Sequence, residues 1–207
     1  MFEDREDAGK NLALKLKRII KGKDYIVVAL LRGGIVLGKK ISDYFQIPLY
    51  PLVIRKIGSP DNPELAIGAI GPKKTIYWDE KFIKYLSVNN DYKSIIIEEK
   101  SKEVEGLEKI FKTQSASRQI KNKKVILVDD GVATGASAIC ASIFLKKEKT
   151  KEIILAAPIV TKDILRDINK YFDRVIALKV VENLGSVGEF YRCFPQVSNE
   201  EALSRML

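Results

Sequence analysis

Hydrophobic residues form short unbroken runs over much of the chain, and amphipathic stretches separate these runs. The runs that predict buried strands are residues 25–31, 47–54, 124–129, 152–160 and 173–181. In the stretches between them, apolar positions recur with the period of an α-helix. The stretches that predict helices are residues 5–21, 35–45, 94–113, 138–147, 162–169 and 200–206. Hydrophobic strands that alternate with helices predict an α/β fold, with a twisted parallel sheet flanked by helices on both faces.

The middle of the chain follows this pattern less clearly. The sequence RKIGSPDNPE at residues 55–64 is rich in Gly, Pro, Asn and charge, which predicts a long mobile loop. Two weaker strands are predicted over residues 65–70 and 75–78. The polar stretch 80–121 has helical periodicity and predicts a short helix followed by the longer one.

A length of 207 residues is that of one ordinary domain, and no linker or internal repeat divides the chain. We therefore expect a single domain over residues 1–207, with a flexible loop region at 55–70 and a helical insertion at 80–121. The tail, residues 182–207, is expected to form a small hood over the sheet.

The composition narrows the possible chemistry. The chain has no histidine, which excludes a Ser-His-Asp triad, a Cys-His pair and any metal site built on histidine. The two cysteines, Cys140 and Cys193, are far apart and too few for a structural zinc site. They predict free buried thiols in a reducing compartment.

Basic residues outnumber acidic ones by 36 to 27, so the formal net charge is +9. Most of the positive charges are lysines that lie scattered or next to acids, as in KKEKTKE. This favours a solvated surface over a nucleic-acid face, which typically has clustered arginines and aromatic residues. The longest apolar run, residues 153–160, is too short to span a membrane, and the charged N-terminus does not have the pattern of a signal peptide. We expect a cytoplasmic protein.

The segment most informative about function is VILVDDGVATGASA, residues 125–138. A buried strand ends there in Asp129 and Asp130, and a short loop with Thr134 and Ser137 leads into a helix. Ligands of open α/β sheets bind outside the carboxyl ends of the strands, and a helix N-terminus suits a phosphate. The two acids can accept hydrogen bonds from sugar hydroxyls or hold a hydrated Mg²⁺. The alternative is a capped helix beside an ordinary surface turn.

This segment resembles the phosphoribosyl pyrophosphate (PRPP) signature of type I phosphoribosyltransferases. LLRGG at residues 30–34 is similar to the loop that grips pyrophosphate in that family. VIRKIGSPDNPELAIGAIG at residues 53–71 is similar to its flexible catalytic loop. Together, RKIGSPDNPELAIGA and VDDGVATGAS most closely resemble a bacterial and archaeal branch usually called predicted phosphoribosyltransferases. The resemblance covers most of the chain and implies the type I phosphoribosyltransferase fold.

The resemblance implies a Mg²⁺-dependent enzyme that moves the 5-phosphoribosyl group from PRPP to a nitrogenous base or a related acceptor and releases pyrophosphate. It also implies a homodimer. The chemistry agrees with the composition, because displacing pyrophosphate from a sugar requires positioning and charge stabilisation and needs no histidine.

The resemblance also assigns roles to residues. Asp129 and Asp130 contact the ribose hydroxyls directly or through Mg²⁺, and are thus the candidate metal ligands. The residues implied to hold the 5-phosphate are Ala133, Thr134, Gly135, Ala136 and Ser137. Those implied to hold pyrophosphate are Arg32, Gly33 and Gly34, while Arg55 and Lys56 close over it as catalytic residues. A cis or strained peptide bond is expected between Leu31 and Arg32.

One departure from the family pattern concerns the acceptor. Members that use 6-oxopurines have an aspartate where this chain has Ala133, which argues against hypoxanthine, guanine or xanthine and leaves the general base open. Phe190, Tyr191 and Phe194 of the tail either stack on the acceptor or pack internally, and Trp78 is expected in the core or an interface. The alternative function is a PRPP-binding regulatory protein without transfer activity, with RNA contact through its basic surface.

Overall fold

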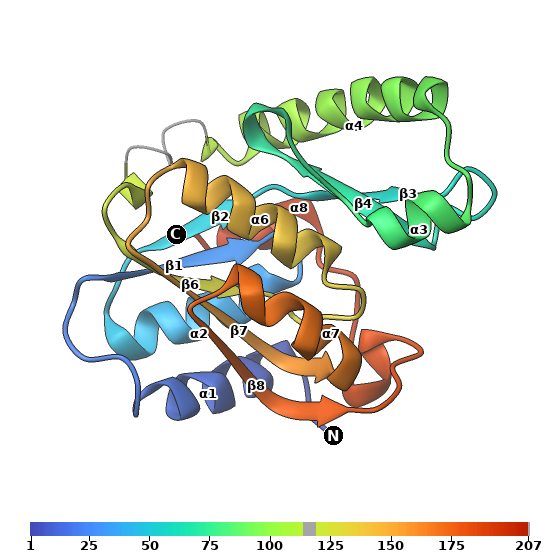
Figure 1. Cartoon of the computed structure of the whole chain (residues 1–207). Coiled ribbons are helices and arrows are strands. Elements are labelled where there is room, and N and C mark those ends of the chain that lie inside the picture. The colour runs from blue at the N-terminus through green and yellow to red at the C-terminus, as the bar shows by residue number, and fades with distance from the viewer. Residues whose placement is uncertain (114–118, 207) are drawn as a thin grey trace.

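Five parallel strands form the main sheet of the computed structural model, which describes residues 1–113 and 119–206 (Figure 1). Their order across the sheet is β2-β1-β6-β7-β8. The bounds are β1 Tyr25–Leu30, β2 Leu49–Leu52, β6 Lys124–Val128, β7 Glu152–Thr161 and β8 Arg174–Val181. The predicted parallel sheet is confirmed, and β2 is shorter than the hydrophobic run that predicted it.

Helices cover both faces of this sheet (Figure 1). On one face lie α1 (Arg5–Leu16) and α2 (Gly34–Phe45), and on the other lie α6 (Ala136–Lys147) and α7 (Lys162–Ile168). Alternate residues of each strand point to opposite faces, so a strand covered on both sides needs apolar residues at every position. In β6, for example, Ile126 and Val128 pack with α1 and α2, whereas Val125 and Leu127 pack on the α6 side.

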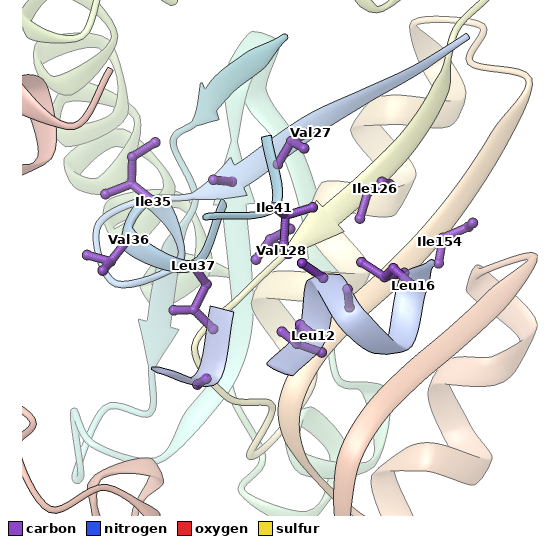
Figure 2. Packing of buried hydrophobic residues seen from close by; sticks show 14 of the residues in the cluster. Leu12, Leu16, Val27, Ile35, Val36, Leu37, Ile41, Ile126, Val128 and Ile154 are labelled. Atoms are coloured by element: carbon purple, nitrogen blue, oxygen red, sulfur yellow. The ribbon is translucent and has the colours of Figure 1, made fainter. Parts of the chain in front are cut away.

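Figure 2 shows the core on the first of these faces. Leu12 and Leu16 of α1 and Ile41 of α2 lie against Ile126 and Ile154 of the sheet, and all five are fully buried. The apolar spacing along α1 places these leucines on one side of the helix. Asp4 begins α1 by accepting a hydrogen bond from the backbone N–H of Asp7 at 2.8 Å. The helix ends at Leu16, earlier than the predicted residue 21.

A second, antiparallel sheet was predicted only in part, because strands were expected over residues 65–70 and 75–78 but not over residues 55–58. It consists of β3 (Arg55–Gly58), β4 (Ala66–Gly71) and β5 (Thr75–Trp78), and it projects beyond the parallel sheet with α3 (Glu80–Tyr85) and α4 (Asn90–Ile110) (Figure 1). The prediction of a mobile loop from residue 55 onward is therefore wrong for β3. Turn-forming residues dominate that stretch, but Ile57 among them is fully buried in a core shared with α4.

The remaining elements are short. The 3₁₀ helices are Pro72–Lys74, Asn169–Tyr171 and Val187–Phe190, and the final helix α8 is Asn199–Ser204. The predicted short and long helices of the insertion correspond to α3 and α4; residues 114–118 of that insertion, and Leu207 of the tail, lie outside the described residues.

The structure also bears on the expectations for the cysteines, for Trp78 and for membrane-spanning segments. Both cysteines are free, as predicted, but only Cys140 is buried, and the prediction of a buried Cys193 is wrong because it lies exposed in the tail. Trp78 packs partly buried against the core around Ile57. None of the described helices has both the length and the apolar composition that crossing a membrane requires.

Candidate functional site

The loop after β6 lies at the carboxyl edge of the parallel sheet and is anchored to the neighbouring strand β7. The backbone N–H of Asp129 donates to the carbonyl of Ala156 at 3.3 Å, and that of Val132 donates to Ile159 at 2.9 Å. These bonds continue the strand pairing past the end of β6. They fix Asp129 and Asp130 at the edge where ligands of such sheets bind.

A cavity of about 320 Å³ opens at this edge. Its lining includes most of the residues predicted to contact the sugar and the pyrophosphate, namely Arg32, Gly33, Arg55, Lys56, Asp129 and Asp130, together with Ser137 of the predicted 5-phosphate loop. Gly34 is not among the described lining residues. It lies behind the cavity as the first residue of α2, where an added Cβ would stand 2.6 Å from the carbonyl oxygen of Val128. Its role in the structure is thus close packing of α2 against the end of β6.

A smaller adjoining pocket is formed by the predicted phosphate loop. Its lining includes Ala133, Thr134, Gly135, Ala136 and Ser137, together with Lys56 and Asp129. Gly135 precedes the first residue of α6 and has a φ of 76°, a conformation that glycine adopts at little cost. This turn starts α6 at Ala136, earlier than the predicted residue 138, and its unpaired backbone N–H groups and positive dipole end suit an anion.

The two adjacent acids have different surroundings. Asp130 accepts a hydrogen bond from Nε of Arg5 at 2.8 Å. The side chain of Asp130 is only 18% exposed and that of Arg5 only 9%. Nη1 of Arg5 also donates to the carbonyl of Pro195 at 2.7 Å, and its guanidinium carbon lies 3.5 Å from the centroid of the Phe194 ring. The carbonyl of Asp130 accepts from the Tyr191 hydroxyl at 2.7 Å. Helix α1 and the C-terminal tail thus hold this acid in place.

Asp129 forms no ion pair with any residue that the structure describes. Burial at the strand end, and next the negative charge of Asp130, raise the pKa of the Asp129 carboxyl group, while the positive charge of Lys56 acts in the opposite direction. Asp129 lines both the cavity and the smaller pocket. Its Oδ1 accepts a hydrogen bond from the backbone N–H of Asp130 at 3.0 Å. A carboxyl group without an ion-pair partner at such a place is well situated to bind a cation or a hydroxyl group.

The pyrophosphate-loop prediction also has a structural counterpart. The peptide bond between Leu31 and Arg32 is cis, which confirms the expectation from the family resemblance. Gly33 lies so close to the second acid that an added Cβ would stand 1.8 Å from Oδ2 of Asp130. This close approach brings the backbone after β1 and the acids after β6 to the same wall of the cavity.

The tail aromatic residues pack internally. Tyr191 is buried in the core, burial raises the pKa of its phenol, and Phe194 stacks between Tyr191 and Arg5. None of Phe190, Tyr191 and Phe194 is among the described residues that line the cavity. The tail instead reaches the cavity through Val187, which covers Gly131.

Sequence reasoning missed Arg5 and Val187 as site residues. Arg5 is separated from Asp130 by 125 positions, and in the sequence it is one more charged residue at the start of an amphipathic helix. Val187 resembles any apolar residue of the tail. Neither position carries a local signal that distinguishes it, because its importance arises only when distant segments meet.

Comparisons with known proteins agree with the fold. The family model described as "Phosphoribosyl transferase domain" matches residues 2–190. A Mycobacterium tuberculosis protein, provisionally named a phosphoribosyl transferase, is 31% identical over 204 residues, which make up 99% of this chain and 46% of that protein. The chain therefore spans about half the length of the curated relatives it matches.

Solved structures show the same architecture. The protein TT1426 from Thermus thermophilus is 26% identical, with a TM-score of 0.76 and coverage of 99% of this chain and 97% of that one. A hypoxanthine-guanine phosphoribosyltransferase from Bacillus anthracis is 15% identical, with a TM-score of 0.50 over 92% of this chain and 89% of that one, and so shares the fold. With the family model matched from residue 2 to residue 190, and with Asp129, Asp130 and the loop after them at the carboxyl edge of the sheet, this chain belongs to the phosphoribosyl transferase domain family.

Proposed function

We propose that the protein transfers the 5-phosphoribosyl group from PRPP to a nitrogenous acceptor, with release of pyrophosphate and with Mg²⁺ as cofactor. Two acids, three basic side chains and the loop before α6 line two adjoining cavities, and the proposal rests on this observation. A sugar that carries a phosphate at one end and a pyrophosphate at the other requires groups of these kinds in this arrangement.

Each part of the site has a role in this proposal. The backbone N–H groups at the start of α6, with the hydroxyls of Thr134 and Ser137, bind the 5-phosphate. Asp129 and Asp130 accept hydrogen bonds from the ribose hydroxyls and orient the sugar. Arg32 and the backbone of Gly33, with Arg55 and Lys56, stabilise the negative charge that grows on the departing pyrophosphate.

The acids also fit a Mg²⁺ ion that arrives with the substrate. Magnesium in such sites binds one or two protein carboxylates and takes its other ligands from water and substrate phosphates. Asp129 supplies an unpaired carboxylate beside the cavity, and the described residues contain no group of three or more acidic or thiol side chains that would form an all-protein cage. When bound, the ion neutralises charge on the pyrophosphate.

The acceptor in this proposal is a base other than a 6-oxopurine. Ala133 lines the pocket beside the sugar site with a methyl group, where the resemblance placed an aspartate in enzymes that use hypoxanthine, guanine or xanthine. Without that carboxylate, the chain lacks the acceptor for an N–H of such a base at this position. Adenine and orotate are the first acceptors to test.

An assay of pyrophosphate release tests the proposed function. PRPP and Mg²⁺ are supplied with adenine, orotate, hypoxanthine or guanine in turn, and thermal stability is followed in parallel. We expect release with one acceptor, and none when Mg²⁺ is chelated. If PRPP stabilised the protein but no acceptor in a wider panel led to pyrophosphate release, the result would instead support the regulatory alternative. A steep salt dependence of RNA binding would then identify RNA as the partner of that regulatory protein.

Gly33 provides a prediction about the geometry of the same site. Replacing Gly33 with alanine is expected to displace the carboxylate of Asp130, because the new Cβ would overlap Oδ2. We expect PRPP affinity, measured by calorimetry with Mg²⁺, to fall by roughly 10- to 100-fold, the effect of losing one hydrogen bond to a charged group.

Gly106 offers the matched control. It lies inside α4, and an added Cβ there has no neighbour within 4 Å. Gly106→Ala is expected to leave PRPP affinity unchanged and to raise stability by about 0.5–1 kcal/mol, because alanine favours a helix interior. Equal PRPP affinity of Gly33→Ala and the wild type would contradict the proposed sugar site.

A further inference from the structure

Arg55 forms an ion pair with Glu103, an acid of helix α4. Its Nε donates to Oε2 of Glu103 at 2.6 Å, and the other carboxylate oxygen of Glu103 accepts from Nζ of Lys100 at 2.6 Å. Although burial acts to raise it, the hydrogen bonds from Lys100 and Arg55 lower the pKa of Glu103 overall. Glu103 is therefore ionised at neutral pH and forms a charge-assisted hydrogen bond with the guanidinium group.

The contact lies on the side of Arg55 away from the proposed sugar site. Arg55 lines both the cavity of about 320 Å³ and a second cavity of about 380 Å³ that adjoins it, whereas Glu103 lines only the second. A guanidinium group presents its donors as a planar fork. With Nε bonded to Glu103, the two terminal amino groups are the donors left for an anion in the first cavity.

The helix that carries Glu103 is itself firmly placed. Val104, the next residue of α4, is 2% exposed and belongs to the core that also contains Val53 and Ile57 on either side of Arg55. The distance between α4 and the start of β3 is thus set by packing. Such support fixes a long side chain that would otherwise sample many rotamers in a loop or at a strand end.

We propose that Glu103 is a positioning residue that fixes the guanidinium of Arg55 for contact with the pyrophosphate leaving group. This inference rests on the proposed function and gives the α4 insertion a part in it. Arg5 and Asp130 show the same arrangement in reverse, since there a basic side chain outside the cavity holds an acid that lines it.

Glutamine in place of Glu103 tests the inference, and Glu99→Gln is the matched control. Glu99 lies one turn earlier on α4 and bonds to the same Lys100 at 3.0 Å, but it has no hydrogen bond to Arg55. We expect Glu103→Gln to raise the KM for PRPP by roughly 10-fold, the effect of weakening one charge-assisted hydrogen bond. Glu99→Gln is expected to stay within about twofold of the wild type, as is usual for an exposed ion pair.

A double-mutant cycle separates positioning from a structural effect. In an Arg55→Ala background, Glu103→Gln is expected to have no further effect on KM or kcat, because the residue it acts through is absent. Thermal unfolding of each variant verifies that it is folded, and Glu103→Asp, which keeps the charge at shorter reach, provides a second variant with an intermediate KM.

Three results would overturn the inference. The first is an unchanged KM in Glu103→Gln, and the second is an effect of Glu103→Gln on KM that is equally large in the Arg55→Ala background. The third is a gain in activity in Glu103→Gln, which would mean that Glu103 keeps Arg55 away from the substrate. If the wild type itself neither binds PRPP nor releases pyrophosphate, the proposed function fails. Titration with inorganic pyrophosphate then still tests whether Glu103 positions Arg55 for an anion.

Discussion

Asparagine in place of Asp129 is expected to slow pyrophosphate release by about 10²- to 10³-fold, the range seen when one preorganised group that stabilises charge in a transition state is removed. The same substitution is expected to raise the Tm of the unliganded protein by about 2–4 °C, or roughly 1 kcal/mol for a chain of this size. The carboxylate of Asp129 lies beside a second acid, and burial disfavours its charge, so the neutral amide removes an unfavourable interaction. Steady-state kinetics and thermal unfolding measure the two effects.

A loss of activity together with a gain in stability in Asp129→Asn would identify Asp129 as a functional residue. Asp24→Asn is the control, because Asp24 is an exposed acid that lies before β1 and far along the chain from the loop. It is expected to change neither quantity beyond about 0.5 kcal/mol, as is usual for surface substitutions. If Asp129→Asn lowered the Tm, or left pyrophosphate release at the wild-type rate, Asp129 would have a structural role instead.

Replacing Arg5 with alanine is expected to cost about 3 kcal/mol of stability, since removing one partner of a buried ion pair leaves the other charge without compensation. For a chain of this length, that corresponds to a fall in Tm of roughly 6–12 °C. The guanidinium group also bonds to Pro195 and stacks on Phe194, so the tail loses its attachment to α1 at the same time. Asp130 is then no longer held, and PRPP affinity falls as well.

Lys10 provides the comparison on the same helix, because it is an exposed residue of α1. Lys10→Ala is expected to leave the Tm and PRPP affinity close to those of the wild type. A second variant, Arg5→Lys, keeps the charge but loses the planar fork, and it is expected to recover part of the stability. An Arg5→Ala protein as stable as Lys10→Ala would show that the pair with Asp130 contributes little.

The parallel sheet was predictable because its central strands β1, β6 and β7 are buried on both faces, so that their sequences are unbroken apolar runs such as YIVVAL and KVILV. The loop after β6 was predictable for a similar reason, since its acids, glycine and hydroxyl residues are adjacent in the sequence. The antiparallel sheet was predicted only in part, because strands were expected at the positions of β4 and β5 but not at that of β3. β3 has a single fully buried residue, Ile57, among glycine, proline and charged neighbours, so its partner strand and α4 determine its structure.

The residues that support the site could not be identified from the sequence. Arg5, Glu103 and Val187 come from three different parts of the chain, and each contacts a residue of the cavity wall that is distant in the sequence. Charges at the start of a helix or along its exposed side are common, and nothing in their local pattern reveals a partner. The residues proposed to touch substrate form recognisable motifs, whereas those that hold them in place depend on the complete fold.

Calorimetric titration of PRPP into the wild-type protein, with and without Mg²⁺, tests the central claim most directly. The claim is that the acids after β6 and the loop at the start of α6 form one site for a phosphorylated sugar. Saturable binding of PRPP that strengthens with Mg²⁺ and is lost in Asp129→Asn is the result we predict. Absence of PRPP binding by the folded wild-type protein in the presence of Mg²⁺, or equal binding by Asp129→Asn, would contradict it.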